Sequence, residues 1–205
     1  AAQLSCAIQT PPTLTWNGTK HRYEPEPMLL RVDLGNNGTL PATNGSVTLE
    51  YDASVFDLLE SATPVQLLDT LHALGQASLQ WKLRVKPQAN ARTSELCVRS
   101  NFTGAGELRC CAPVNIPAAG MLLTCAIGLP SIQYIETAKV FVPNPFNLDL
   151  QVFNPGVVGS GALSALLQLP EGLYVESGEP YDKILNPASL PPGQSAAVEW
   201  RVRIV

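Results

Sequence analysis

The sequence predicts an all-β protein made of two antiparallel β-sandwiches in tandem, and three observations lead to this fold class. Segments of the first half of the chain return, in order, in the second half. Apolar residues alternate with polar ones at a period of two in several runs. These runs are short, and most of the 18 prolines fall between them, in clusters with Gly and Asn. Many short, half-buried strands separated by turns are typical of antiparallel sandwiches.

The internal repeat sets the expected domain organisation. Residues 4–8 (LSCAI) return as 123–127 (LTCAI), residues 30–34 (LRVDL) as 148–152 (LDLQV), and residues 81–85 (WKLRV) as 200–204 (WRVRI). The expected domains are residues 1–118 and residues 119–205, joined by a short tether at 117–120. Two domains fit a chain of 205 residues, since a typical domain has about 100–150 residues.

The alternating runs are expected to be strands with one face in a core. Successive strand side chains point to opposite faces. In residues 79–85 and 198–204 this places Trp81 and Trp200 on inward faces among Leu and Val, as core anchors. Only residues 65–74, with apolar side chains at 65, 67, 68, 71 and 74, have a spacing that favours a helical turn or two.

The two copies differ at their ends. The first continues with residues 95–100 and 107–111, which flank the turn 101–106 and predict a β-hairpin. The second copy reaches Val205 where this hairpin should begin. We therefore expect two immunoglobulin-like sandwiches, the second lacking its last hairpin, and a chain that is a fragment of a longer protein. The alternative is that another chain supplies the missing strand, as in donor-strand complementation.

The five cysteines lead to the same expectation. Counting inward from the turn places Cys97 opposite Cys110, with Cys111 facing the other way. One bond within or beside the hairpin is expected, and Cys6 takes the remaining hairpin cysteine, but the connectivity stays open. Cys125 stands where Cys6 stands in the first copy, so its partner would lie in the absent hairpin. Such dense cysteines indicate an oxidising compartment. The alternatives are five reduced cysteines, or a zinc site, which the lack of a paired C-x-x-C disfavours.

A family resemblance rests on the repeated loop and tryptophan. Residues 190–193 (LPPG) precede Trp200, and residues 71–75 (LHALG) precede Trp81 in a weaker form that lacks both prolines. This arrangement resembles repeated bacterial cell-surface modules, the immunoglobulin-like and fibronectin-III-like sandwiches that include the CARDB type. The resemblance implies a secreted or cell-surface, non-catalytic adhesive or spacer module.

The chemistry-bearing residues do not predict an enzyme, a cofactor or a metal. Neither His21 nor His72 is flanked by a G-x-S-x-G nucleophile sequence. The net charge is −4 without a basic stripe, so no nucleic-acid partner is expected. The apolar runs are far shorter than the ~20 residues that a membrane span needs, so no membrane insertion is expected either.

Residues 16–23 are the candidate ligand-binding loop. Trp16, Asn17, His21 and Tyr23 combine aromatic faces with hydrogen-bonding groups, a mixture that carbohydrate and peptide sites use. The alternative is that Trp16 closes the end of the first core. Four Asn-x-Ser/Thr sequons are interpreted first as turn chemistry and second as glycosylation sites. They begin at Asn17, Asn37, Asn44 and Asn101.

The functional hypothesis is a structural or adhesive spacer of a secreted or surface-anchored bacterial protein. Its expected partners are other proteins or neighbouring domains of the same chain. The first alternative is an accessory carbohydrate-binding module of an extracellular hydrolase, which contacts glycan through the Trp16 loop. The second alternative is a subunit that self-assembles through the open edge of the second domain.

Overall fold

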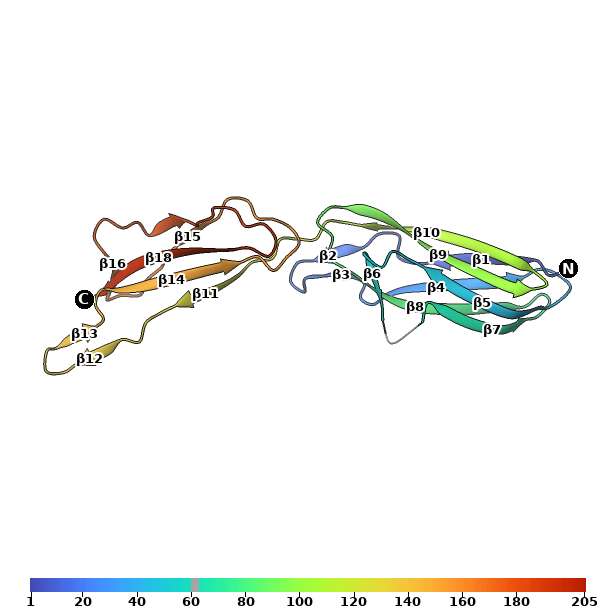
Figure 1. Cartoon of the computed structure of the whole chain (residues 1–205), viewed down its shortest axis with the longest axis horizontal. Helices are drawn as coiled ribbons and strands as arrows, with labels where there is room; N and C mark the ends of the chain where they lie inside the picture. Colours follow the sequence, from blue (N-terminus) through green and yellow to red (C-terminus); the bar gives the residue numbers. More distant parts are fainter. Residues whose placement is uncertain (60–62) are drawn as a thin grey trace. The chain divides into compact units, whose positions relative to one another are not determined.

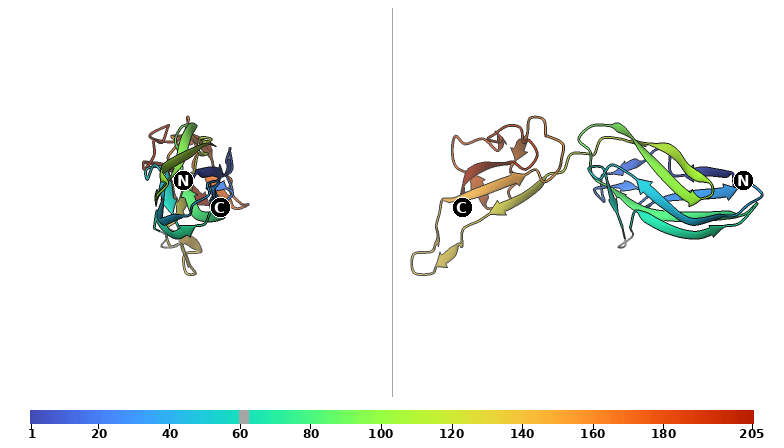
Figure 2. Two further views of the ribbon diagram at one scale, coloured as in Figure 1. Left: turned by 90° about the vertical axis from the view of Figure 1, so that its right-hand side faces the viewer. Right: turned by 45° about the vertical axis from the view of Figure 1, so that its right-hand side comes forward.

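The computed structural model describes residues 1–59 and 63–205, and it confirms the predicted all-β, immunoglobulin-like sandwich fold (Figure 1; Figure 2). The chain divides into an N-terminal unit, Ala1–Gly120, and a C-terminal unit, Met121–Val205. Every regular element in the described ranges is a β-strand, and the strands pair antiparallel within each sheet. These ranges hold no helix that could span a membrane.

The N-terminal unit is a sandwich of two four-stranded sheets. The first has the order β1 (Leu4–Gln9), β4 (Met28–Asn36), β8 (Gln76–Val85) and β6 (Phe56–Leu58). The second has the order β10 (Gly106–Ile116), β9 (Arg92–Thr103), β5 (Ala42–Glu50) and β7 (Val65–Leu71). A small hairpin, β2 (Thr15–Asn17) and β3 (Arg22–Glu24), lies outside these sheets.

The core of the N-terminal unit fills the space between its two sheets. Trp81 is 1% exposed, and its Nε1 donates to the Thr63 carbonyl at 3.3 Å. The hairpin β9–β10 contributes five fully buried apolar side chains to this core, namely Leu96, Val98, Phe102, Val114 and Ile116. Without this hairpin, the second sheet would not cover the apolar face of the first sheet.

The C-terminal unit repeats the first sheet but only part of the second. Its large sheet has the order β11 (Thr124–Gly128), β14 (Phe146–Phe153), β18 (Ser195–Ile204) and β16 (Leu173–Val175). The repeated sequences equate β11, β14 and β18 with β1, β4 and β8, and the strand order equates β16 with β6. The other pairs are β12 (Gln133–Ile135) with β13 (Val140–Val142) and β15 (Ser164–Leu166) with β17 (Asp182–Ile184). Residues 121–205, all of which the structure describes, hold no counterpart of β9 or β10.

The core of the C-terminal unit is correspondingly small and divided. One buried cluster consists of Phe146, Leu148, Trp200 and Val202, and another consists of Val152, Leu185, Leu190 and Ala196. Trp200 is 1% exposed, and its Nε1 donates to the Pro180 carbonyl at 3.1 Å.

Buried asparagines occupy equivalent corners in the two units. The Nδ2 of Asn36 donates to the carbonyls of Leu40 and Leu71, and its Oδ1 accepts from the Gly38 N–H. In the same way, the Nδ2 of Asn154 donates to the carbonyls of Val158 and Leu190, and its Oδ1 accepts from Gly156 N–H. Each asparagine thus forms hydrogen bonds with backbone groups of a loop that lacks regular strand pairing. Buried polar groups in proteins are generally hydrogen-bonded, and these asparagines provide the partners.

The helical turn expected in residues 65–74 is wrong. Residues 65–71 form the strand β7, which pairs with β5 from Val65 opposite Thr48 to Leu71 opposite Ala42. The apolar spacing was ambiguous, because Val65, Leu67 and Leu71 also fit a period of two. The backbone hydrogen bonds to β5 favour the strand over the helical turn. Pairing with a neighbouring strand outweighs the local preference of such a short segment.

The predicted register of the hairpin is wrong by one residue. Cys111, not Cys110, lies opposite Cys97, and Cys110 lies opposite Val98. The chain turns through three residues between the paired Phe102 and Gly106, and Gly106 has φ +79°. A left-handed glycine at this place is typical of three-residue hairpin loops. A slip of one residue exchanges the two faces of a strand, so Cys111 lies on the same face as Cys97.

Candidate functional site: the open groove of the C-terminal unit

An apolar groove lies between the large sheet of the C-terminal unit and the segment around β15. Its volume is about 260 Å³. The groove-lining side chains that matter here are Leu123, Cys125, Leu150, Val152, Ala165 and Leu185. The lining also includes Thr124 and Ser164, but most of it is hydrocarbon, so the groove favours an apolar occupant over an ion or a sugar.

The same place in the N-terminal unit is filled by β9 and β10. There β5 pairs with β7 along one edge and with β9 along the other. Among the residues that the structure describes, its counterpart β15 pairs with β17 alone. An unpaired strand edge presents backbone N–H and C=O groups that can bind another strand. Within residues 121–205, the groove thus combines an apolar floor with a strand edge whose backbone groups pair with no neighbouring strand.

Side chains of β11 are more exposed than their counterparts on β1. Ile8 of β1 is partly buried against the N-terminal core, whereas its counterpart Ile127 is 62% exposed. Cys6 packs on the same core, whereas Cys125 is exposed. Full burial of one such side chain contributes about 1.5–3 kcal/mol. An occupant of the groove would therefore gain a substantial apolar contact.

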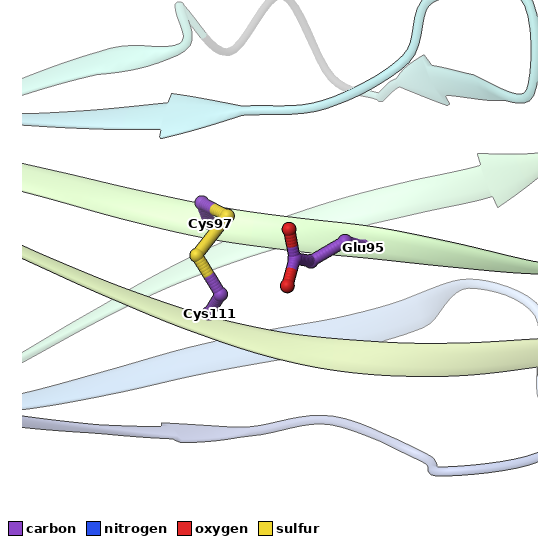
Figure 3. Close-up of side chains that lie close together, drawn as sticks. All are labelled: Glu95, Cys97 and Cys111. Carbon is purple, nitrogen blue, oxygen red and sulfur yellow. A yellow bond between two sulfur atoms is a disulfide. The ribbon is translucent and has the colours of Figure 1, made fainter.

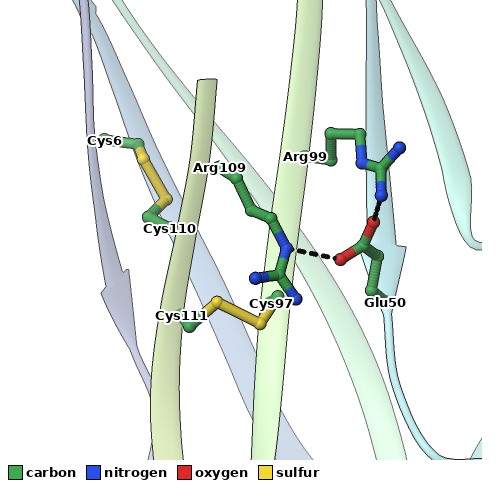
Figure 4. The surroundings of a disulfide bond; sticks show 7 residues. All are labelled: Cys6, Glu50, Cys97, Arg99, Arg109, Cys110 and Cys111. Carbon is green, nitrogen blue, oxygen red and sulfur yellow. Dashed lines mark hydrogen bonds and ion pairs between the residues drawn. A yellow bond between two sulfur atoms is a disulfide. The ribbon is translucent and has the colours of Figure 1, made fainter. Parts of the chain in front are cut away.

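Four of the five cysteines form disulfides. Cys6 is bonded to Cys110, which joins β1 of the first sheet to β10 of the second, and Cys97 is bonded to Cys111 within the hairpin (Figure 4). The alternative of five reduced cysteines is therefore wrong. Cys125 is the free cysteine of the described residues.

A cluster of possible metal ligands on the hairpin has a structural explanation. Glu95, Cys97 and Cys111 place one ligand atom each within 4.8 Å of one another. Figure 3 shows the two sulfur atoms bonded to each other beside the carboxylate. A zinc site needs thiolates, and a disulfide offers none, so this cluster does not support the zinc alternative.

Ion pairs connect β5 with the two strands of the hairpin, β9 and β10. Arg109 Nε donates to Glu50 Oε2 at 2.8 Å, and Arg99 pairs with Glu50 Oε1 (Figure 4). The hydrogen bond from Arg109 is the main cause that holds the pKa of Glu50 below its usual value. The two arginines are exposed and Glu50 is partly exposed, and ion pairs at the surface contribute about 0–1 kcal/mol. These pairs therefore link the strands on the outer face without dominating the stability of the unit.

The predicted ligand-binding loop is only partly available to a ligand. Tyr23 is 2% exposed, and its hydroxyl donates to the Pro117 carbonyl at 2.7 Å and accepts from the Gln88 N–H. Burial raises the pKa of Tyr23. The expected role of Tyr23 in a binding surface is therefore wrong, because its ring belongs to the core.

Trp16 covers Tyr23 at the end of this core. It is half-buried, packs edge-on against Tyr23 with ring centroids 5.0 Å apart, and keeps its buried Nε1 without a hydrogen-bond partner. This placement favours the alternative that Trp16 closes the core. Asn17 and His21 remain at the surface, where Asn17 Oδ1 accepts from the Thr19 N–H and His21 has φ +51° in the turn.

The sequon asparagines lie in different local settings. Asn17 is half-exposed, and the other three are exposed. Asn44 has φ +49° at the bulge between Thr43 and Ser46, and Asn37 Nδ2 donates to Ser5 Oγ. The hydrogen bond of Asn17 and the left-handed backbone of Asn44 are what turn chemistry predicts.

Comparison with known proteins shows only distant structural similarity. No family model matches the chain, and no curated protein matches it. A protein of unknown function from Porphyromonas gingivalis W83 is 9% identical over 97% of this chain and 82% of its own, with a TM-score of 0.37. The E. coli chaperone DraB is 12% identical over 97% and 85%, with a TM-score of 0.34. The periplasmic chaperone SfaE is 10% identical over 98% and 87%, with a TM-score of 0.34. Similarity at this level carries no information on function.

Proposed function

We propose that this chain is a non-catalytic structural or adhesive segment of a secreted or surface-anchored bacterial protein, and that it binds protein partners. The observation that carries the proposal is the apolar groove of the C-terminal unit in the part of the chain that the structure describes. It combines an apolar floor with an edge of β15 that carries no second strand within residues 121–205, and such a combination can recognise an extended polypeptide. In this segment the N-terminal unit acts as a closed spacer and the C-terminal unit as the contact surface.

The disulfides support the proposed location outside the cytoplasm. Cys6–Cys110 and Cys97–Cys111 both tie down the hairpin that completes the N-terminal sandwich. Structural disulfides form and persist in secreted, periplasmic and cell-surface proteins, because the cytosol keeps thiols reduced.

The acids Glu24 and Glu179 are engaged with neighbouring lysines. Lys20 pairs with Glu24, and Lys183 pairs with Glu179, so these acids serve in surface ion pairs. The glycan alternative has less support, because Tyr23 lies in the core and Trp16 is half-buried against Tyr23.

A comparison of peptide and glycan binding tests this proposal. The full chain is screened against displayed peptides of alternating apolar pattern and against a polysaccharide panel. We expect peptide binding that Ala165→Lys in the groove abolishes, because the change places a charge among apolar side chains. Trp16→Ala should leave this binding unchanged. Retention on a polysaccharide that is lost with Trp16→Ala, without peptide binding, would contradict the proposal and favour the accessory module.

A further inference from the structure

The two disulfides of the N-terminal unit differ in what they connect. Cys6–Cys110 joins β1 of the first sheet to β10 of the second, and both cysteines pack against the core. Cys97–Cys111 joins directly opposite residues of β9 and β10. These two strands are also held together by a short turn and by eleven paired positions. Opening of Cys97–Cys111 would therefore leave the sandwich closed.

The two cysteines of this hairpin disulfide differ in accessibility. Cys97 lies between Leu96 and Val98, which point into the core, so its own side chain is on the outer face of the sheet. It is nevertheless only 3% exposed, whereas Cys111 is exposed. A reagent from solvent therefore meets the disulfide at Cys111.

The cover over Cys97 is an ion pair. Arg109 on β10 donates to Glu50 on β5, and β9 lies between these two strands (Figure 4). Glu50 is directly opposite Cys97 in the pairing of β5 with β9. The Arg109 side chain thus crosses β9 close to Cys97, and the ion pair shields this sulfur from attack.

A carboxylate lies beside the accessible end of the disulfide. Glu95 is on the outer face of β9, and one of its oxygens lies within 4.8 Å of both sulfur atoms (Figure 3). The two arginines, Arg99 and Arg109, both pair with Glu50 on β5, on the far side of β9 from β10. Negative charge beside the sulfur attracts a thiol that carries a positive group and repels an anionic thiol.

We propose that Cys97–Cys111 is an exchange site at which a cationic thiol becomes covalently attached to Cys111. The inference goes beyond the proposed function, because it gives the N-terminal unit a modification site of its own. Exposed disulfides are more labile than those packed in a core. The redundant link, the accessible sulfur and the neighbouring carboxylate occur together at this one place on the hairpin.

The reaction is a thiol–disulfide exchange. The thiolate of the incoming compound attacks the sulfur of Cys111, and a new S–S bond forms between them. The bond to Cys97 breaks, and Cys97 leaves as a thiolate that takes up the proton released by the incoming thiol. No net oxidation occurs, because one disulfide replaces another.

The second disulfide serves as an internal control. Cys6 and Cys110 are partly buried against the core, so a thiol reaches them only after the two sheets have opened. Exchange at this bond must wait for that opening, whereas exchange at Cys111 does not. The two bonds should therefore react at different rates in the same molecule.

The test uses the full chain with Cys125→Ser, which removes the free thiol. The chain is incubated with excess cysteamine under native conditions and quenched with acid, which protonates thiolates and stops exchange. Intact mass and peptide mapping then locate the adduct. We expect cysteamine on Cys111 at least about tenfold faster than on Cys6 or Cys110, with Cys97 as the free thiol.

A second probe distinguishes small thiols from protein thiols. It is a short peptide with one cysteine between two lysines, used under the same conditions. Conjugation of both probes to Cys111 supports the site for either source of thiol. Conjugation of cysteamine alone supports it for small thiols, and conjugation of neither probe would overturn the inference.

Two variants separate the carboxylate from general reactivity. Glu95→Gln should lower the preference for cysteamine over the anionic 3-mercaptopropionate by about three- to fivefold at 0.1 M salt. Glu107→Gln is the matched control, because it removes the same charge four residues from Cys111 along β10, about 13 Å away. It should leave the preference unchanged, and equal effects of the two variants would contradict the role of Glu95.

A third variant tests the shielding of the leaving sulfur. Arg109→Ala should uncover Cys97, so that adducts appear on Cys97 as well as on Cys111. Adducts mainly on Cys97 without this change, or equal rates at the two disulfides, would overturn the inference. Loss of the cooperative thermal transition of the N-terminal unit in the adduct would also overturn it. None of these results bears on peptide binding by the groove, so the proposed function is tested separately.

Discussion

The two disulfides should contribute unequally to the stability of the N-terminal unit. Cys6 and Cys110 are 104 residues apart, whereas Cys97 and Cys111 are 14 apart. In the chain-entropy model, a cross-link that closes a loop of this larger size stabilises by about 4.7 kcal/mol, and one that closes the smaller loop by about 3 kcal/mol. Replacing both cysteines of a pair by alanine should therefore cost about 1.7 kcal/mol more for Cys6–Cys110, roughly a twentyfold difference in the unfolding equilibrium.

Urea unfolding of the two double variants measures this difference. Tryptophan fluorescence in a Trp200→Phe background reports the N-terminal unit alone, because Trp16 and Trp81 both lie within it. Cys125→Ser in every sample prevents disulfide exchange. Equal losses, or a larger loss for the Cys97–Cys111 pair, would refute the entropic reasoning and show that local packing in the hairpin dominates.

Three further substitutions test the core, the buried corner and the outer face. Trp81→Ala should cost about 3–5 kcal/mol by leaving a cavity, and an unchanged urea midpoint would place Trp81 outside the core. Asn36→Ala should cost at least about 1–3 kcal/mol, because buried backbone groups lose their partner; hydrogen exchange at Gly38 would report the opened corner. The lowered pKa of Glu50 means that its contribution is present above its unfolded-state pKa and is lost as the pH falls through the folded-state value. Glu50→Gln should therefore flatten the acid limb of the stability curve, and an identical limb in both proteins would contradict this role.

The sequence predicted those strands whose pattern is local. Residues 79–85 and 148–152 alternate strictly, and they lie in β8 and β14. A period of two is a property of neighbouring residues and does not depend on the rest of the fold. The difference between the two copies at their ends was also visible, because repeat copies can be compared without a structure.

The rest depended on geometry that the sequence does not display. The hairpin register followed from the left-handed backbone of Gly106, and the disulfide partners followed from the register. The burial of Tyr23 depends on Pro117, which is 94 residues away in the chain. The buried asparagines had a detectable signal in the sequence, since Asn-x-Gly recurs at Asn36 and Asn154.

The corner built on Asn36 has a consequence for the chemical ageing of the protein. Asparagine deamidates when the backbone nitrogen of the next residue attacks its side-chain carbonyl carbon, and a following glycine makes this attack easiest. Asn37 is followed by Gly38, but the Gly38 N–H donates to the buried Oδ1 of Asn36 at 3.0 Å. Its nitrogen is therefore held away from the attack. Asn17 precedes Gly18 in an open turn, so during storage succinimide and isoaspartate should accumulate at Asn17 well before Asn37.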